Sequence, residues 1–463
     1  MKDLKENTSP FITISRLITM LEDHTPIPLR LEANLELKVL CPGPDDGDRG
    51  DIPTTTPLAV PETVSLIISP PGCSLHVTET GRGTHNSGRS WILCLEEYDI
   101  VSGDYLDKID RAVEQIIQYT PSIVKGLILC GTCIDVLLGT DYDFYTDHLS
   151  KKYGIRVSAQ IMGPILKGTP GSGLYHMYTA IYRLLRFPDK PIAEKSVNIL
   201  GILKDPSPDS ELPALLHDAG IDKIYYIGDF ISLEACDNMI CSLLNIVVCE
   251  SALTAAEEMK RKFQIPYIVL LPSYDPDTIH EYYQKISEAL NLSVDDSFYY
   301  KKARKLLHLL RAKAVDITCA VGERNISPVL NVALDTIALG FRLEAIFLRK
   351  AASADLPILR KIAAENPDTR IYYDTHPGMW NYIHSPQNYD ISFGVPFPYL
   401  RNTPYTMDAP IHFPYIDYAA LERLITRINR LLDCRRQTHS VPDEDTIHKK
   451  RRWIIYRQER KEL

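Results

Sequence analysis

The stretch LILCGTCIDVLLGTD, residues 127–141, combines a short apolar segment, two cysteines and the start of a helix. Its first residues form an apolar run without helical periodicity, which is typical of a buried strand. Cys130 and Cys133 fall where this strand is expected to end, and Gly139 and Asp141 open a helix. In open α/β sheets, ligands bind beyond the carboxyl ends of the strands. The two cysteines are therefore either packing residues or ligands.

A helix that ends in glycine and leads at once into a branched apolar strand recurs along the chain. It occurs in KKYGIRVSA (151–159), LHDAGIDKIYYIG (216–228) and TIALGFRLEAIFL (336–348). Glycine suits the end of a helix because it adopts the left-handed backbone conformation at little cost. Helices and strands that alternate in this way indicate parallel sheets with crossover helices.

The chain has 463 residues, too many for a single hydrophobic core. The segment CPGPDDGDRGDIPTTTPLAVP is rich in Pro, Gly and Asp and predicts an irregular arm. New strand–loop–helix units open at SVNILGILKD and at DITCAVGERN. We predict an α/β fold of three tandem Rossmann-like domains, each a doubly wound parallel sheet, with clefts between them. The expected units are an irregular N-terminal arm (1–60), a first domain with the candidate cysteines (61–195), a middle domain (196–315), a third domain (316–433) and a basic C-terminal tail (434–463).

The composition, 45% hydrophobic and 24% charged, is that of an ordinary globular protein. The net charge of −9 argues against a nucleic-acid or anionic-membrane surface. There is no apolar signal region at the N-terminus and no apolar run near the roughly 18 residues of a membrane span. We therefore expect a cytoplasmic protein without nucleic-acid or membrane partners. Its ten cysteines should be thiols or metal ligands rather than disulfides.

Several familiar site motifs are absent from the sequence. The segment LKGTPGSGLYHMY (166–178) superficially resembles a phosphate loop, but Gly173 is followed by Leu174 and Tyr175 instead of Lys and Ser or Thr. The chain therefore has no visible nucleoside triphosphate site of its own. Cys130 and Cys133 have no second Cys-x-x-Cys to complete four ligands, which argues against a structural zinc site.

Two further cysteines stand at predicted strand ends. Cys73 follows Pro-Pro-Gly in IISPPGCSLHV, and Cys94 precedes an acidic turn in WILCLEEYDIVSGDYLDKI. Cys73, Cys94 and Cys133 could converge on an iron–sulfur cluster, whose irons are bound by thiolates. Core packing explains isolated cysteines equally well, because cysteine is a favoured buried residue.

Taken together, these segments resemble the nitrogenase component 1 superfamily, which includes the molybdenum–iron protein subunits and the protochlorophyllide and nickel-tetrapyrrole reductases. PPGC is similar to the family's Gly-x-x-Gly-Cys segment, and LEEYDIVSGD to its Glu-x-Asp-Ile-Val-Phe-Gly-Gly segment. TCIDVLLGTD resembles the segment Thr-Cys-x-x-x-x-Ile-Gly-Asp-Asp, and NIVVCES and FGVPFPYL resemble the later domains. The order and spacing of these pieces carry the resemblance.

The resemblance implies that Cys73, Cys94 and Cys133 bind an iron–sulfur cluster, 4Fe-4S or larger. Cys94 stands a few residues nearer the Asp-Ile-Val segment than the family's second ligand does. Cys130 is expected to pack within its strand. Three thiolates from one chain leave at least one iron without a ligand from that chain. A second component 1 chain, identical or homologous, is therefore implied, as a dimer or a heterotetramer.

A second metallocofactor site is implied near Cys249 in NIVVCES, where a cysteine of the molybdenum–iron α subunit holds one end of the cofactor. A cysteine that closes a buried strand is the alternative. Arg401 takes roughly the place of that subunit's histidine anchor after Gly-Val-Pro-Phe. Arginine does not ligate iron as histidine does, which disfavours dinitrogen reduction on an iron–molybdenum cofactor. Arg401 would suit a carboxylate, or it is a surface residue.

The function implied is that of a catalytic-component subunit in a nitrogenase-like, ATP-dependent reductase. In this class a separate P-loop iron–sulfur protein hydrolyses ATP and supplies electrons, which the cluster relays to a substrate or metallocofactor. His176 and His412 are candidates for proton transfer, although either can be structural. The alternatives are a non-catalytic scaffold for metallocluster assembly or carriage, and a metal-free binding protein that keeps only the fold. The sequence does not name the substrate.

Overall fold

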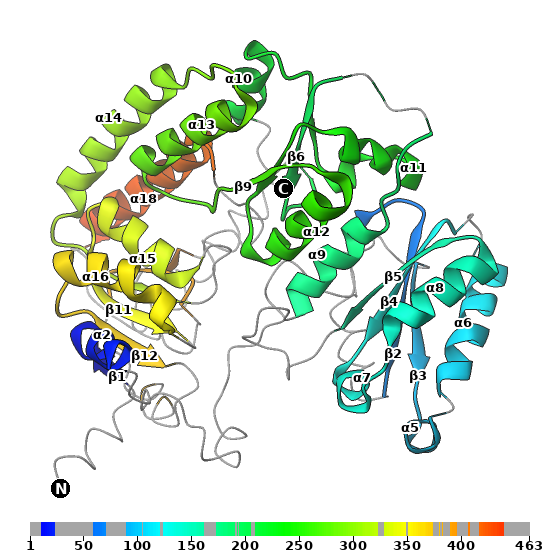
Figure 1. The fold of residues 1–463 in the computed structure, drawn as a ribbon. Helices are drawn as coiled ribbons and strands as arrows, with labels where there is room; N and C mark the ends of the chain where they lie inside the picture. The colour runs from blue at the N-terminus through cyan, green and yellow to red at the C-terminus, as the bar shows by residue number, and fades with distance from the viewer. Residues whose placement is uncertain are drawn as a thin grey trace, which may run out of the picture.

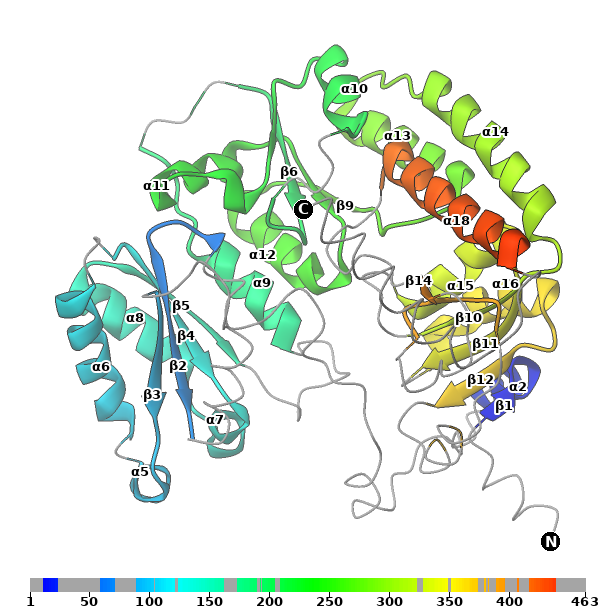
Figure 2. The same cartoon turned by 180° about the vertical axis from the view of Figure 1, so that it is seen from behind.

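The computed structural model describes residues 11–23, 59–70, 89–103, 105–120, 124–161, 173–189, 192, 194–204, 209–322, 328–348, 351–373, 379, 382, 389–395, 406–407 and 416–438. Three separate, mostly parallel sheets lie along an arc, with the middle sheet between the other two (Figures 1 and 2). Helices connect and cover them. The predicted α/β class with three Rossmann-like units is confirmed.

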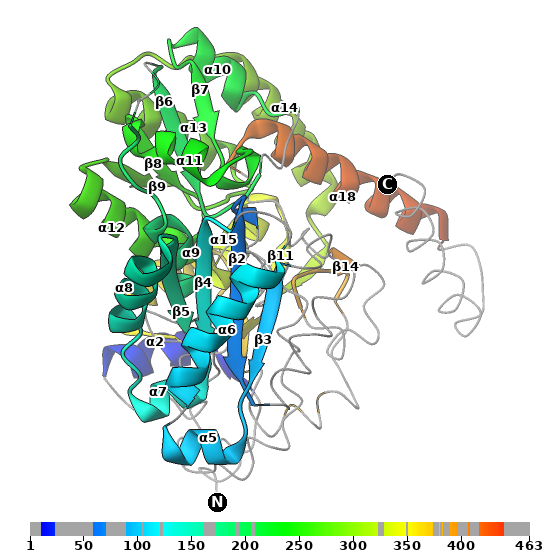
Figure 3. The same cartoon turned by 90° about the vertical axis from the view of Figure 1, so that its right-hand side faces the viewer.

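The first sheet has four parallel strands in the order β3-β2-β4-β5. They are β2 (Thr63–Ser69), β3 (Ser90–Cys94), β4 (Gly126–Gly131) and β5 (Arg156–Ile161). The helices of this unit are α5 (Glu97–Ser102), α6 (Tyr105–Tyr119), α7 (Cys133–Leu138), α8 (Tyr142–Tyr153) and α9 (Gly173–Arg183). The buried residues of α6 pack on one face of the sheet, over which this helix lies in Figure 3. The buried residues of α9 pack on the other face.

The middle sheet repeats this topology in the order β7-β6-β8-β9, again all parallel. Its strands are β6 (Ser196–Leu200), β7 (Lys223–Tyr225), β8 (Leu244–Val247) and β9 (Tyr267–Val269). Around it lie α10 (Leu212–Asp218), α11 (Leu233–Cys236), α12 (Leu253–Phe263) and the short 3₁₀ helices η4 (Ile227–Asp229), η5 (Asp237–Cys241) and η6 (Glu250–Ala252). In the first sheet, β3 lies on one side of β2 and β4 on the other. In the middle sheet, β7 and β8 flank β6 in the same way. A topological switch point therefore lies between β2 and β4, and another between β6 and β8.

The third sheet has the order β1-β12-β11-β10-β13-β14 within the described residues. Its parallel strands are β10 (Thr318–Val321), β11 (Arg342–Leu348), β12 (Arg370–Tyr373), β13 (Ile391–Phe393) and β14 (Thr406–Met407). The helices are α13 (Pro276–Leu290), α14 (Ser297–Ala314), α15 (Val329–Ala338), α16 (Leu356–Glu365), α18 (Tyr418–Thr438) and the 3₁₀ helix η7 (Ser353–Asp355). The switch point of this sheet lies between β10 and β13.

Part of the N-terminal segment differs from the irregular arm expected from the sequence. β1 (Phe11–Thr13) pairs antiparallel with β12, and α2 (Ile14–Glu22) follows at once. Ile14, Leu17 and Leu21 form an apolar stripe on α2 and are buried in the core of the third unit. The local sequence does not predict β1, because this short strand forms only by hydrogen bonding to the edge strand β12 of the third sheet. The predicted domain boundaries themselves remain predictions.

The three glycines predicted to end helices do so. Gly154, Gly220 and Gly340 have φ angles of 66°, 92° and 96°, and each precedes the strand expected from the sequence by a few residues. A side chain would strain this left-handed backbone, which explains why glycine recurs there.

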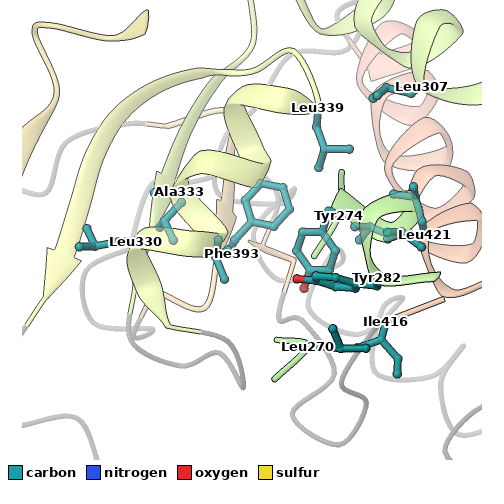
Figure 4. Close-up of a cluster of buried hydrophobic side chains, with 14 of the residues drawn as sticks. Leu270, Tyr274, Tyr282, Leu307, Leu330, Ala333, Leu339, Phe393, Ile416 and Leu421 are labelled. Atoms are coloured by element: carbon teal, nitrogen blue, oxygen red, sulfur yellow. The ribbon is translucent and has the colours of Figure 1, made fainter. Parts of the chain in front are cut away.

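The hydrophobic cores cross the boundaries between the sheets. One face of the middle sheet, with Leu200 and Val247, shares a core with Ile67 and Ile128 of the first sheet. The other face, which includes Val197, shares a core with the third unit. Figure 4 shows part of this second core, with Tyr274 and Tyr282 near Leu339 and Phe393. The middle sheet is therefore packed against both of its neighbours.

No helix within the described ranges is both long and apolar enough to cross a bilayer.

Candidate functional site

Two of the three candidate cluster ligands lie at the carboxyl edge of the first sheet. Cys94 is the last residue of β3 and pairs with Ser69, the last residue of β2. Cys133 is the first residue of α7 and follows the last residue of β4 by two positions. β3 and β4 flank β2 on either side, so the two backbone positions lie at one edge of the sheet. Cys73, four residues after Ser69, lies outside the described residues.

The Cys94 side chain is exposed, so it does not pack in a core. Along β3 the exposed residues Ser90, Ile92 and Cys94 alternate with Trp91 and Leu93, which pack against the core beneath α6. Cys94 therefore points to the face of the sheet opposite α6. A soft sulfur ligand in this open position suits iron or an iron–sulfur cluster. The Cys133 side chain is not among those described.

Cys130, three residues before Cys133, is a packing residue as expected. It is fully buried, with its sulfur 3.1 Å from Ser65 Oγ and 2.9 Å from Gln160 Nε2. Burial raises the pKa of the Cys130 thiol to about 11. It is therefore protonated at neutral pH, whereas metal ligation requires the thiolate.

A buried carboxylate that the sequence analysis did not single out supports the first turn of α7. Asp135 Oδ2 accepts the Thr132 backbone N–H at 2.6 Å, and Asp135 Oδ1 accepts the Tyr142 hydroxyl at 2.9 Å. Burial raises the pKa of the Asp135 carboxyl above its ordinary value. The pattern Thr-x-x-Asp across a strand–helix junction, a variant of the capping box, is the signal that could have identified it.

Cys249 lies at the switch point of the middle sheet, two residues after β8. Its neighbour across the switch point is Gly201, which follows β6 with φ +104°; a Cβ built there would lie 2.6 Å from Cys249 Cβ. Tyr178 of α9 donates its hydroxyl to the Gly201 carbonyl at 2.7 Å. The Cys249 side chain is half-buried. It therefore lies near a helix of the first unit and is not enclosed in apolar packing.

The third switch point is built by two glycines. Gly322 follows β10, and its N–H donates to the Phe393 carbonyl at 2.9 Å. A Cβ on Gly322 would lie 2.6 Å from the Gly394 carbonyl oxygen, so the two strand ends approach too closely for a side chain. Gly394 opens the Gly-Val-Pro-Phe segment. Arg401 and His412 lie outside the described residues, as does the side chain of His176.

Among the side chains that the structure describes, no three of His, Cys, Asp or Glu gather in a metal-binding arrangement. The side chains of Cys73 and Cys133 are not in that set. A hollow of about 600 Å³ lies elsewhere, at the amino ends of β4 and β5. Its cations are already paired, Lys125 with Glu62 and Glu234, and Arg156 with Asp237. We interpret it as part of the joint between the first and middle units.

Comparison with known proteins agrees with this topology. The family model described as nitrogenase component 1 type oxidoreductase matches residues 56–376, more than half of the chain. The chain belongs to this family. A solved structure described as nitrogenase Cp1 at pH 6.5 superposes with a TM-score of 0.66 at 16% identity, covering 85% of this chain and 93% of that one. A second, nitrogenase Cp1 at pH 5, gives 0.56 at 16% identity, covering 87% and 90%.

The two superpositions show that this nitrogenase component 1 type protein has the fold of those structures. The family to which it belongs is described as a type of oxidoreductase. A comparison with curated protein sequences found no match.

Proposed function

We propose that the chain is a subunit of the catalytic component of a nitrogenase-like, ATP-dependent reductase. The observation that carries this proposal is the placement of Cys94 at the end of β3 and of Cys133 just after β4. These strands flank β2, and their carboxyl edge is where α/β folds bind ligands. Membership of an oxidoreductase family supports it. Cys73 follows β2 itself and is the proposed third ligand.

In this proposal, the three thiolates hold an iron–sulfur cluster, which when bound supplies one-electron redox chemistry. The protein determines where the cysteine ligands lie and which of their sulfur atoms a metal can reach. Cys94 is open to solvent, while Cys130 is kept neutral by burial in the sheet beneath. Three thiolates do not complete a cluster, so a second component 1 chain, identical or homologous, is proposed to supply the remaining ligands.

Exposed apolar side chains near these cysteines support a protein partner. Tyr98 and Val101 of α5 are 70% and 82% exposed, and Leu137 and Leu138 of α7 are 73% and 49% exposed. α5 follows Cys94 and α7 begins at Cys133. Large apolar side chains gathered outside a core are typical of a docking surface. We propose that this surface receives the second component 1 chain, which the incomplete set of cluster ligands requires.

Cys249 and Arg401 are the proposed residues of a substrate or second metallocofactor site. Cys249 stands at the middle switch point beside Gly201. Arg401 follows the third switch point in sequence and would bind a carboxylate rather than iron. Dinitrogen reduction on an iron–molybdenum cofactor is therefore not part of the proposal.

The test is anaerobic purification with iron and acid-labile sulfide analysis. The wild-type chain should contain both, and Cys133→Ala should lose most of both because it removes a proposed ligand. Cys130→Ala is the matched control: it removes a thiol three residues away that is buried in packing, and it should keep the iron of each folded molecule. An iron-free wild type from a host able to make clusters would refute the proposal.

A further inference from the structure

The first turn of α7 is held by a buried polar network from three different elements. Asp135 lies within α7 and is almost fully buried, and its carboxylate accepts the backbone N–H of Thr132 at 2.6 Å. Thr132 is the residue that caps the helix, immediately before Cys133. The bond therefore anchors the backbone on one side of the cysteine to a side chain on the other side of it.

The second oxygen of this carboxylate is held from α8. Tyr142, the first residue of α8, is buried and donates its hydroxyl to Asp135 Oδ1 at 2.9 Å. The ring of Tyr142 lies against the end of β4, because a Cβ on Gly131 would be only 2.7 Å from it. Tyr142 thus connects the strand end, the carboxylate and the next helix.

A third contact comes from α6. Tyr105, the first residue of that helix, is buried, hydrogen-bonds with Thr140 and also interacts with Asp135. Thr140 lies between α7 and α8, and its N–H donates to the Asp135 carbonyl at 3.0 Å. The network therefore fixes the residues after α7 as well as those before it.

α7 needs this support because it is short. It has six residues, fewer than an isolated helix needs in water, and two of them, Leu137 and Leu138, are exposed. Both oxygens of the Asp135 side chain accept hydrogen bonds, and these bonds help to hold the short helix in place.

We propose that Asp135 and Tyr142 are positioning residues that hold Cys133 in the geometry required for metal ligation. The inference rests on the proposed cluster but concerns residues that do not touch it. Removing the carboxylate leaves the Thr132 N–H and the Tyr142 hydroxyl without acceptors inside the fold, so the first turn should open locally.

The experiment compares Asp135→Ala with Asp135→Asn, whose amide oxygen can still accept the Thr132 N–H. The matched control is Asp275→Ala, which removes a carboxylate cap from α13, where Asp275 accepts the Thr278 N–H at 3.2 Å. Two readouts are needed: hydrogen–deuterium exchange of the α7 amides in the metal-free full chain, and iron per folded molecule after anaerobic purification.

Asp135→Ala should exchange the α7 amides about tenfold faster and lose most of its iron, while the α6 and β4 amides are unchanged. Asp135→Asn should recover much of both properties, and Asp275→Ala should alter neither. If Asp135→Ala fails to fold, Tyr142→Phe keeps the ring against Gly131 and should show a smaller change in the same direction. Unchanged exchange, or faster exchange with wild-type iron, would overturn the positioning role. A wild-type protein without iron would refute the proposed cluster. The exchange measurement uses metal-free protein, so its outcome does not depend on whether the cluster exists.

Discussion

Four of the six described cysteines fall into two kinds of environment. Cys130 and Cys319 are fully buried inside strands, and burial raises the pKa of their thiols to about 11 and about 12. Both are therefore neutral at physiological pH and behave as small apolar residues. Cys94 is exposed and Cys249 is half-buried, and each stands at or just past a strand end. A metal can reach a sulfur atom in such an open position, so the placement of Cys94 and Cys249 suits ligation.

The substitution Cys249→Ser tests whether Cys249 is a metal ligand or a packing residue. The substitution keeps the side-chain volume nearly unchanged, so the chain should fold normally and retain the first cluster. Any metal bound in addition to that cluster should be lost, because a serine hydroxyl is a poor replacement for a soft thiolate. Metal analysis and the visible and magnetic-resonance spectra of the anaerobic protein measure this.

The matched control for Cys249 is Cys319→Ser, at a fully buried position in strand β10. It should lower the free energy of unfolding by on the order of 1–3 kcal/mol, through the buried hydroxyl, while the metal content per folded molecule is unchanged. A Cys249→Ser protein with wild-type metal content and spectra would remove Cys249 from the proposed site.

Among the elements, α15 shows how a buried carboxylate joins two units. Asp335 lies inside this helix and accepts Ser273 Oγ at 2.8 Å and the Tyr274 N–H at 3.0 Å. Both partners belong to the segment between β9 and α13. Among the described residues no cation pairs with this carboxyl, and burial raises the pKa of Asp335 to about 7. The joint is therefore strongest when Asp335 carries a proton.

The stability of this joint should fall as pH rises. The folded chain binds the Asp335 proton up to about pH 7, whereas the unfolded chain releases it near the ordinary value of 3.8. Stability is therefore lost between about pH 4 and pH 7, and from pH 5 to pH 8 the loss is roughly 2–3 kcal/mol. Asp335→Asn preserves an acceptor for the Tyr274 N–H and a donor for Ser273 Oγ but does not titrate.

Thermal unfolding at pH 5 and pH 8 measures the effect on both proteins. The wild type should lose more stability than Asp335→Asn over this interval. Asp368→Asn, which changes an exposed carboxylate between α16 and β12, should retain the wild-type dependence. Identical pH profiles for wild type and Asp335→Asn would contradict the assignment.

At the scale of the whole molecule, the middle sheet has no core of its own. Each of its faces is completed by a neighbour, Leu200 and Val247 with the first sheet and Val197 and Ile199 with the third unit. Arg156 and Asp237 add a two-pronged ion pair, at 2.7 Å for each bond, between the first sheet and η5. The proposed redox site and the proposed substrate site are therefore held in one continuous framework.

Electron transfer to this framework should require a partner with ATP. The purified chain should hydrolyse no ATP, because it contains no Gly-Lys-Ser/Thr phosphate loop. Reduction of its cluster should occur with a cognate P-loop iron–sulfur protein and MgATP, and be lost without nucleotide. Stopped-flow absorbance of the anaerobic mixture measures it. Equal rates without nucleotide would contradict the reductase, and a stable cluster that the partner never reduces would favour the scaffold alternative.

The exposed side chains supply a paired control for this experiment. Leu137→Ser on α7 should weaken association with the second component 1 chain and thereby the reduction of the cluster, because it alters the proposed docking surface. Phe298→Ser on α14 changes a side chain of similar exposure, 72% against 73%, far along the chain from the cysteines. It should leave the reduction rate unchanged, and equal losses in both variants would argue against the proposed surface.

Much of the local structure follows from the sequence by itself. The strand before Cys130, the helix-ending glycines at 154, 220 and 340, and the strand-end place of Cys249 depend on residues close together in the chain. Side-chain periodicity and the conformational freedom of glycine act over a few residues, so they can be recognised without tertiary contacts. The family resemblance also came from short segments and was confirmed.

The tertiary structure decided what depends on distant neighbours. The strand order puts β2 between β3 and β4. As a result, Cys94, at the end of β3, and Cys133, just after β4, lie at the same edge of the sheet. It also gave β1 a partner in β12, 357 or more residues away, and brought Tyr142 to Asp135. Sheet neighbours and buried hydrogen bonds are selected by the packing of the whole chain, because each element buries its apolar face only against others. Local sequence patterns therefore do not predict which strands become neighbours or which buried groups form hydrogen bonds.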